Sequence, residues 1–67
     1  MADVAKVVEI TAESKKSFED AMSKGIERAS KTLKGIKGAW VKEQKILVKG
    51  GKIVAYRVDM KVTFVLD

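Results

Sequence analysis

The stretch that decides the fold runs from Lys45 to Asp67 and reads KILVKGGKIVAYRVDMKVTFVLD. Two apolar segments flank Gly50-Gly51. A Gly-Gly pair between such segments predicts a two-residue β-hairpin turn, because both central positions can take positive φ. The second segment alternates between apolar and polar positions, which predicts a strand with one buried face. That face is expected to carry Val54, Tyr56, Val58, Met60, Val62, Phe64 and Leu66.

The turn also predicts the register of the hairpin. Lys49 would face Lys52, and Trp40, the only tryptophan, would face Lys61 on the side away from the apolar residues. This register leaves Glu43 and Lys45 on the apolar face. A position beyond the helix end, a neighbouring subunit or a bulge in the strand would each explain them. The other expected pairs are Leu47 with Val54, Val41 with Met60, Ala39 with Val62, Gln44 with Arg57, and Lys42 with Asp59.

The first half of the chain predicts a strand and a helix. Residues 4–11 are rich in β-branched side chains and predict a strand, followed by a connection over 12–16. A helix is expected from about Ser14 to Leu33, with Ser14 or Ser17 as its N-cap and Gly35 just past its end. With strands at 37–48 and 53–66, the fold class is α+β in the order β-α-β-β. The helix would pack through Phe18, Met22, Ile26, Ala29 and Leu33.

Composition limits the classes of function that the chain can have. The 67 residues make one domain, 1–67. They contain no Cys and no His, so the commonest metal ligand and the commonest general base are absent, and no metal ligands can be named. No catalytic constellation is visible, and we expect no enzyme. A chain this short is marginal as a monomer, so self-association is expected. The net charge of +5 is dispersed, which favours a solvated surface over nucleic-acid binding.

Localisation is also an expectation from the sequence. No apolar run is long enough to span a membrane, and Met1 to Val4 lack the basic-then-apolar pattern of a signal peptide. A cytoplasmic protein that does not associate with membranes is therefore expected.

An exposed Trp40 allows two interpretations. It could be an anchor buried by another subunit. It could instead be a stacking platform for a flat ligand, with Gln44 and Arg57 supplying hydrogen bonds. Residue types alone favour the interface anchor.

Four segments together resemble the dodecins over nearly the whole chain. They are KVVEI at 6–10, SFEDA at 17–21, RASKTL at 28–33 and YRVDMKV at 56–62. The resemblance implies a three-stranded antiparallel sheet wrapped around one helix and a hollow homododecamer. It also implies a flavin cofactor, FMN or riboflavin, whose ring stacks on Trp side chains near a Gln. Such a shell stores or sequesters its small-molecule ligand without turning it over.

The chain departs from the dodecin pattern at both flavin-binding positions. The stacking Trp of the family falls on Gly38 and the flavin-contacting Gln falls on Arg57. Trp40 is displaced by two residues, which keeps the sheet face and moves the indole roughly 6–7 Å along the strand. The expected cofactor-binding residues are therefore Trp40, Arg57, Gly38 and Gln44, and the charge of Arg57 favours FMN over riboflavin. The alternative is a dodecin-like shell that binds no flavin and holds a cation or another anionic ligand.

Overall fold

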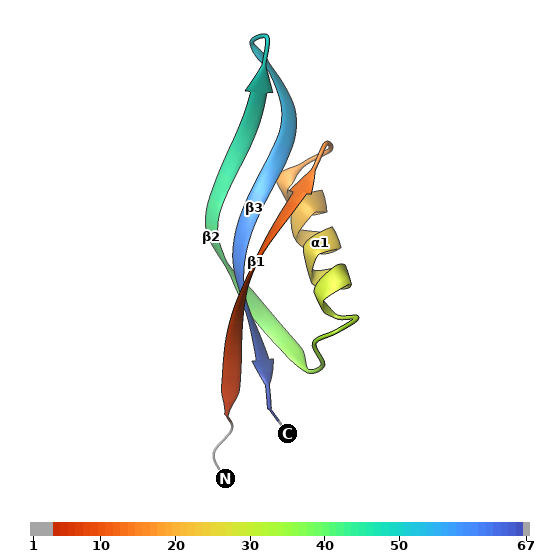
Figure 1. Ribbon diagram of the computed structural model, residues 1–67, viewed down its shortest axis with the longest axis vertical. Coiled ribbons are helices and arrows are strands. Elements are labelled where there is room, and N and C mark those ends of the chain that lie inside the picture. The colour runs from red at the N-terminus through yellow and green to blue at the C-terminus, as the bar shows by residue number, and fades with distance from the viewer. Residues whose placement is uncertain (1–3, 67) are drawn as a thin grey trace.

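The computed structural model describes residues 4–66 and confirms the predicted order of elements. Strand β1 spans Ala5–Ser14, helix α1 Phe18–Ala29, strand β2 Ile36–Lys49 and strand β3 Lys52–Val65 (Figure 1). The three strands form one antiparallel sheet in the order β1-β3-β2, so β3 is central. The prediction about a signal peptide concerns residues that lie mostly outside the described part of the chain.

The hairpin turn is the predicted one. Gly50 and Gly51 have φ values of 59° and 76°, a region that residues with a Cβ rarely adopt. Lys49 pairs with Lys52 across the turn. The Gly-Gly pair therefore joins β2 to β3 in two residues, as the sequence indicates.

The predicted register is correct at both ends of the hairpin and wrong in its middle. Val41 pairs with Met60, Ala39 with Val62 and Trp40 with Lys61, as expected. Between these pairs and the turn, Leu47 pairs with Ala55 rather than Val54, Gln44 with Val58 rather than Arg57, and Glu43 rather than Lys42 with Asp59.

Two β-bulges cause this difference. Val54 is an extra residue in β3 and Lys42 is an extra residue in β2. Because the bulges lie on opposite strands, the first shifts the register by one and the second restores it. The bulge at Lys42 also explains the charged residues that the sequence placed on the apolar face. It pairs Lys45 with Arg57 and Glu43 with Asp59, on the side away from α1.

The core lies between α1 and the inner face of the sheet. Ala21 and Val58 are fully buried, and Met60 is 2% exposed. The aromatic rings of Phe18 and Tyr56 meet edge to face, with centroids 5.2 Å apart. Phe18, Met22 and Ile26 of the predicted helix stripe pack against this centre as expected and Ala29 is buried, whereas Leu33 lies beyond the end of the helix. The residues around the buried centre are Ile10, Ala12, Phe18, Met22 and Ile26.

Helix α1 is shorter than predicted at both ends. Its N-cap is Ser17, whose hydroxyl accepts from the Asp20 backbone N–H at 3.0 Å. The helix ends at Ala29 rather than Leu33. Beyond this point the backbone N–H groups of Lys31 and Thr32 bond to the carbonyls three residues back, of Arg28 at 3.2 Å and of Ala29 at 3.1 Å, so the last turn tightens. Gly35, with φ of 77°, lies in the link to β2 and is not the helix cap.

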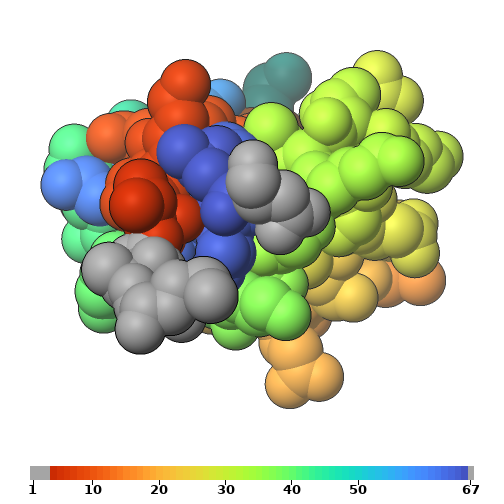
Figure 2. Space-filling model, turned by 90° about the horizontal axis from the view of Figure 1, so that it is seen from below, coloured from red at the N-terminus to blue at the C-terminus, as the bar shows by residue number. Residues whose placement is uncertain are grey.

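The molecule is elongated, with extents of 54 × 20 × 13 Å. The β2–β3 hairpin extends beyond α1 as a two-stranded arm (Figure 1), and the helix covers one side of the sheet only (Figure 2). The chain exposes 5215 Å², against about 4,200 Å² for a compact monomer of its mass. Nowhere in residues 4–66 is a helix long and apolar enough to cross a membrane. The large apolar residues most exposed on the arm are Ile46, Val48, Ile53 and Val54.

Replacing Gly25 by Ala should destabilise the protein. A Cβ at this position would lie 2.9 Å from the Ala12 Cβ and 2.9 Å from the Met60 Cε. The Ala12 Cβ is fixed to the strand backbone, so overpacking of about 1–3 kcal/mol should exceed the roughly 1 kcal/mol gain in helix propensity. Thermal unfolding should show a lower Tm for Gly25→Ala, whereas Ser23→Ala on the exposed helix surface should leave Tm equal or higher. Equal Tm values for the two variants would contradict the close contact.

Acid stability should depend on Ser14 and Asp20. The hydrogen bond from the buried Ser14 hydroxyl, together with nearby Lys24 and Lys16, holds the pKa of Asp20 below its usual value of 3.8. A folded pKa below the unfolded one stabilises the protein above about pH 3.8, and this contribution is lost as pH falls through the folded pKa. In Ser14→Ala the Asp20 pKa, followed by NMR, should rise toward 3.8. The Tm deficit of this variant should shrink below that pH, and a deficit that persists unchanged in acid would refute the linkage.

Candidate functional site

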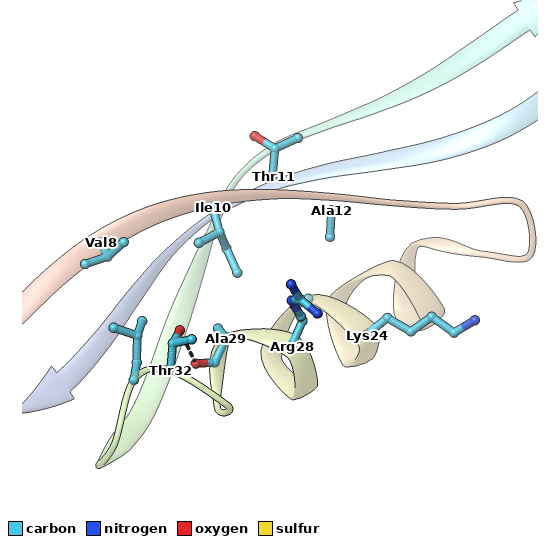
Figure 3. A pocket seen from close by; sticks show the side chains of 10 residues that line it. Val8, Ile10, Thr11, Ala12, Lys24, Arg28, Ala29 and Thr32 are labelled. Carbon is cyan, nitrogen blue, oxygen red and sulfur yellow. Dashed lines mark hydrogen bonds between the residues drawn. The ribbon is translucent and has the colours of Figure 1, made fainter.

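The outer face is the sheet face that points away from α1, and the register arranges it in rows across β1, β3 and β2. Thr11 illustrates the geometry, since its side chain points away from the helix while Ile10 and Ala12 point toward it (Figure 3). The four rows are Val7–Thr63–Gly38, Glu9–Lys61–Trp40, Thr11–Asp59–Glu43 and Glu13–Arg57–Lys45.

Trp40 forms an open aromatic surface on this face. Its residue is 63% exposed, and it pairs with the exposed Lys61, so it does not contact the helix. Gly38 lies two residues along β2 on the same face, and a Cβ built there meets no heavy atom within 4 Å. The indole is therefore flanked by free space into which a flat ring could stack.

Charged side chains pair with one another along the outer face. Lys42 Nζ lies 3.4 Å from a carboxylate oxygen of Glu9. Arg57 donates from Nε and Nη2 to one oxygen of Glu13 at 3.0 and 2.8 Å. Such half-exposed pairs contribute roughly 0–1 kcal/mol to stability, so their main effect is to orient the side chains. A third contact on this face joins the Thr11 hydroxyl to Asp59 at 3.3 Å.

One chain does not bring the four expected binding residues together. Trp40 and Gly38 are neighbours on the outer face. Arg57 shares that face but lies four residues along β3 from Lys61, the partner of Trp40, or roughly 13 Å. Gln44 pairs with the buried Val58 and so lies on the opposite face, and its predicted position beside Arg57 is wrong. The bulge at Lys42 is the physical reason.

A groove lies between β1 and α1, apart from the outer face (Figure 3). This groove of about 630 Å³ is mostly apolar, with Lys24 and Arg28 at its helical side. It opens beside β1, which is an edge strand of the sheet. Its apolar lining consists of Val8, Ile10, Ala12, Gly25, Ala29 and Leu33.

Sequence reasoning missed Glu13 as the partner of Arg57. The first strand was expected to end at Thr11, which left Glu13 in a connection. Strand β1 instead continues to Ser14, so Glu13 pairs directly with Arg57. The alternation of Glu9, Thr11 and Glu13 with apolar residues was the signal that could have extended the strand.

Comparison with known proteins identifies the family. The family model Dodecin matches residues 4–67. A dodecin from Streptomyces davaonensis is 33% identical and superposes with a TM-score of 0.94, covering 100% of this chain and 98% of that one. A variant of the T. thermophilus dodecin is 30% identical with a TM-score of 0.92, covering 98% of each chain. The chain belongs to the dodecin family.

The name of a third relative states a ligand. The calcium dodecin of Mycobacterium tuberculosis, described as having a novel calcium-binding site, is 35% identical with a TM-score of 0.82. The match covers 96% of this chain and 91% of that one. No curated protein sequence matches the chain. Family membership points to small-molecule binding or storage.

Proposed function

We propose that this dodecin binds flavin on its outer face at Trp40 and stores or sequesters it in a homododecameric shell, without turning it over. The observation that carries the proposal is the exposed indole beside the open space at Gly38. Family membership supports a planar ligand on this face, and Trp40 supplies the aromatic surface that Gly38 lacks. Arg57 is proposed as the cationic part of the site.

Because Trp40 and Arg57 lie roughly 13 Å apart in one chain, a single subunit offers an aromatic surface and a separate cation. Assembly would allow Arg57 of one subunit to approach Trp40 of another. The large exposed apolar area of the arm and the open groove along β1 support such subunit contacts.

The competing candidate is a shell that binds no flavin and holds a cation or another anion. The calcium dodecin relative makes this a real competitor. Within residues 4–66 no group of three or more acidic side chains is arranged to hold a metal ion. The aromatic surface is therefore the feature on which the proposal is built, and calcium binding is tested as the competing outcome.

Removing the indole should remove flavin binding. Purified protein is titrated into riboflavin or FMN, and quenching of flavin fluorescence is followed. Loss of a stacking surface and its burial should weaken binding by about tenfold or more in Trp40→Ala, and less in Trp40→Phe, which keeps a ring. Ser23→Ala is the control, since Ser23 lies on the exposed surface of α1, away from both the outer face and the arm. Unquenched wild-type titrations, with calorimetric uptake of Ca²⁺, would favour the competing candidate.

The wild-type chain should assemble. Twelve chains of 7.4 kDa give about 89 kDa, which light scattering can measure directly. Ile53→Lys places a charge on the arm at a residue that is 51% exposed in the single chain, so it should spare the subunit fold and yield smaller species. Ser23→Lys, on the exposed surface of α1, should assemble as the wild type does. A wild-type monomer at micromolar concentration would exclude the shell, and full-sized Ile53→Lys would exclude the arm from its contacts.

A further inference from the structure

Arg57 is not a free cation on the outer face. Its Nε and Nη2 both donate to Oε1 of Glu13, at 3.0 and 2.8 Å. The two residues are direct cross-strand partners, and their side chains remain 44% and 45% exposed. The guanidinium that solvent or a ligand would meet is therefore already hydrogen-bonded to a carboxylate.

The surroundings make Glu13 the group that sets the charge here. On the other side of Arg57 the cross-strand partner is Lys45. Asp59 and Glu9, the other carboxylates of β1 and β3 on this face, contact Thr11 and Lys42 respectively. Glu13 thus cancels one positive charge in its row. An anion that approaches Arg57 must displace this carboxylate or share the guanidinium with it.

Resting on the proposed flavin function, we propose that Glu13 is a specificity-determining residue of the ligand site. By holding and neutralising Arg57, it reduces the preference for phosphate-bearing flavin over neutral flavin. Glu13→Gln isolates this effect, because the amide oxygen can still accept from the guanidinium while the negative charge is removed. Because Glu13 acts through its charge, the effect is the same whether Arg57 meets the ligand of its own subunit or of a neighbour.

The test compares FMN with riboflavin in parallel fluorescence titrations at low ionic strength. Glu13→Gln should raise the ratio of FMN affinity to riboflavin affinity by about two- to fivefold, the range expected for releasing an exposed ion pair. Riboflavin affinity itself should stay nearly constant. The gain should shrink at about 0.15 M salt, where charges are screened.

Two further variants locate the effect. Glu27→Gln removes the same charge from the exposed surface of α1, on the opposite side of the sheet from Trp40 and Arg57, so it should leave the ratio unchanged. In an Arg57→Gln background, Glu13→Gln should have no further effect on the ratio. A ratio that rises equally in Glu27→Gln, or that still rises without Arg57, would overturn the assignment to the Glu13–Arg57 pair.

A second readout separates failure of this inference from failure of the flavin proposal. The Arg57 Nε–H resonance is followed by NMR while inorganic phosphate is added. It should respond at lower phosphate concentration in Glu13→Gln than in wild type. Flavin binding without a changed ratio or phosphate response would overturn the role of Glu13 alone. An earlier phosphate response in a protein that binds neither flavin would refute the flavin site and leave the control of Arg57 by Glu13 supported.

Discussion

The rest of the structure depends on the burial of one face of the central strand. Strand β3 pairs with β1 on one edge and β2 on the other, and its inward residues Val58, Met60 and Val62 are almost completely removed from water. Each such side chain contributes about 1.5–3 kcal/mol relative to exposure. Because alternate residues point to opposite faces, the same burial presents Arg57, Asp59 and Lys61 on the outer side. Core and candidate site are thus two faces of one alternating segment.

Much of this could be predicted from the sequence, because periodicity and turn chemistry are local signals. The β-branched first strand and the helical spacing that follows it, together with the Gly50-Gly51 turn, were sufficient for the order of elements. The turn and the alternation of β3 were sufficient for the outward position of Trp40. The two bulges could not be predicted, since an extra residue changes pairing without changing composition. Their opposite placement explains why both ends of the hairpin were right while Gln44 was assigned to the wrong face.

The candidate site could be predicted only in part, because some of its residues carry a local signal and others depend on distant pairing. Trp40 was found because a single exposed aromatic on a polar face is unusual. Glu13 was missed because the strand was ended at Thr11, although the alternation that continues to Glu13 is a local signal. That its partner is Arg57 depends on pairing across more than forty positions, which no local pattern reports. The helix end was misplaced because the apolar spacing continues to Leu33, while the backbone hydrogen bonds change after Ala29 to partners three residues back. Distant pairing and the tightening of a last helical turn are both weakly visible in a single sequence.

The strand order has a consequence for how the chain folds. Strands β2 and β3 are joined by two residues, and a hairpin of this kind forms within about 1–10 μs. Strand β1 is different, because Ala5 pairs with Val65 and must wait until the last strand has been made. Closing so long a loop costs entropy before any contact compensates it. During synthesis from the N-terminus, β1 and α1 therefore emerge without the surface on which they pack. The β2–β3 hairpin, made last, provides the surface on which β1 and α1 become ordered.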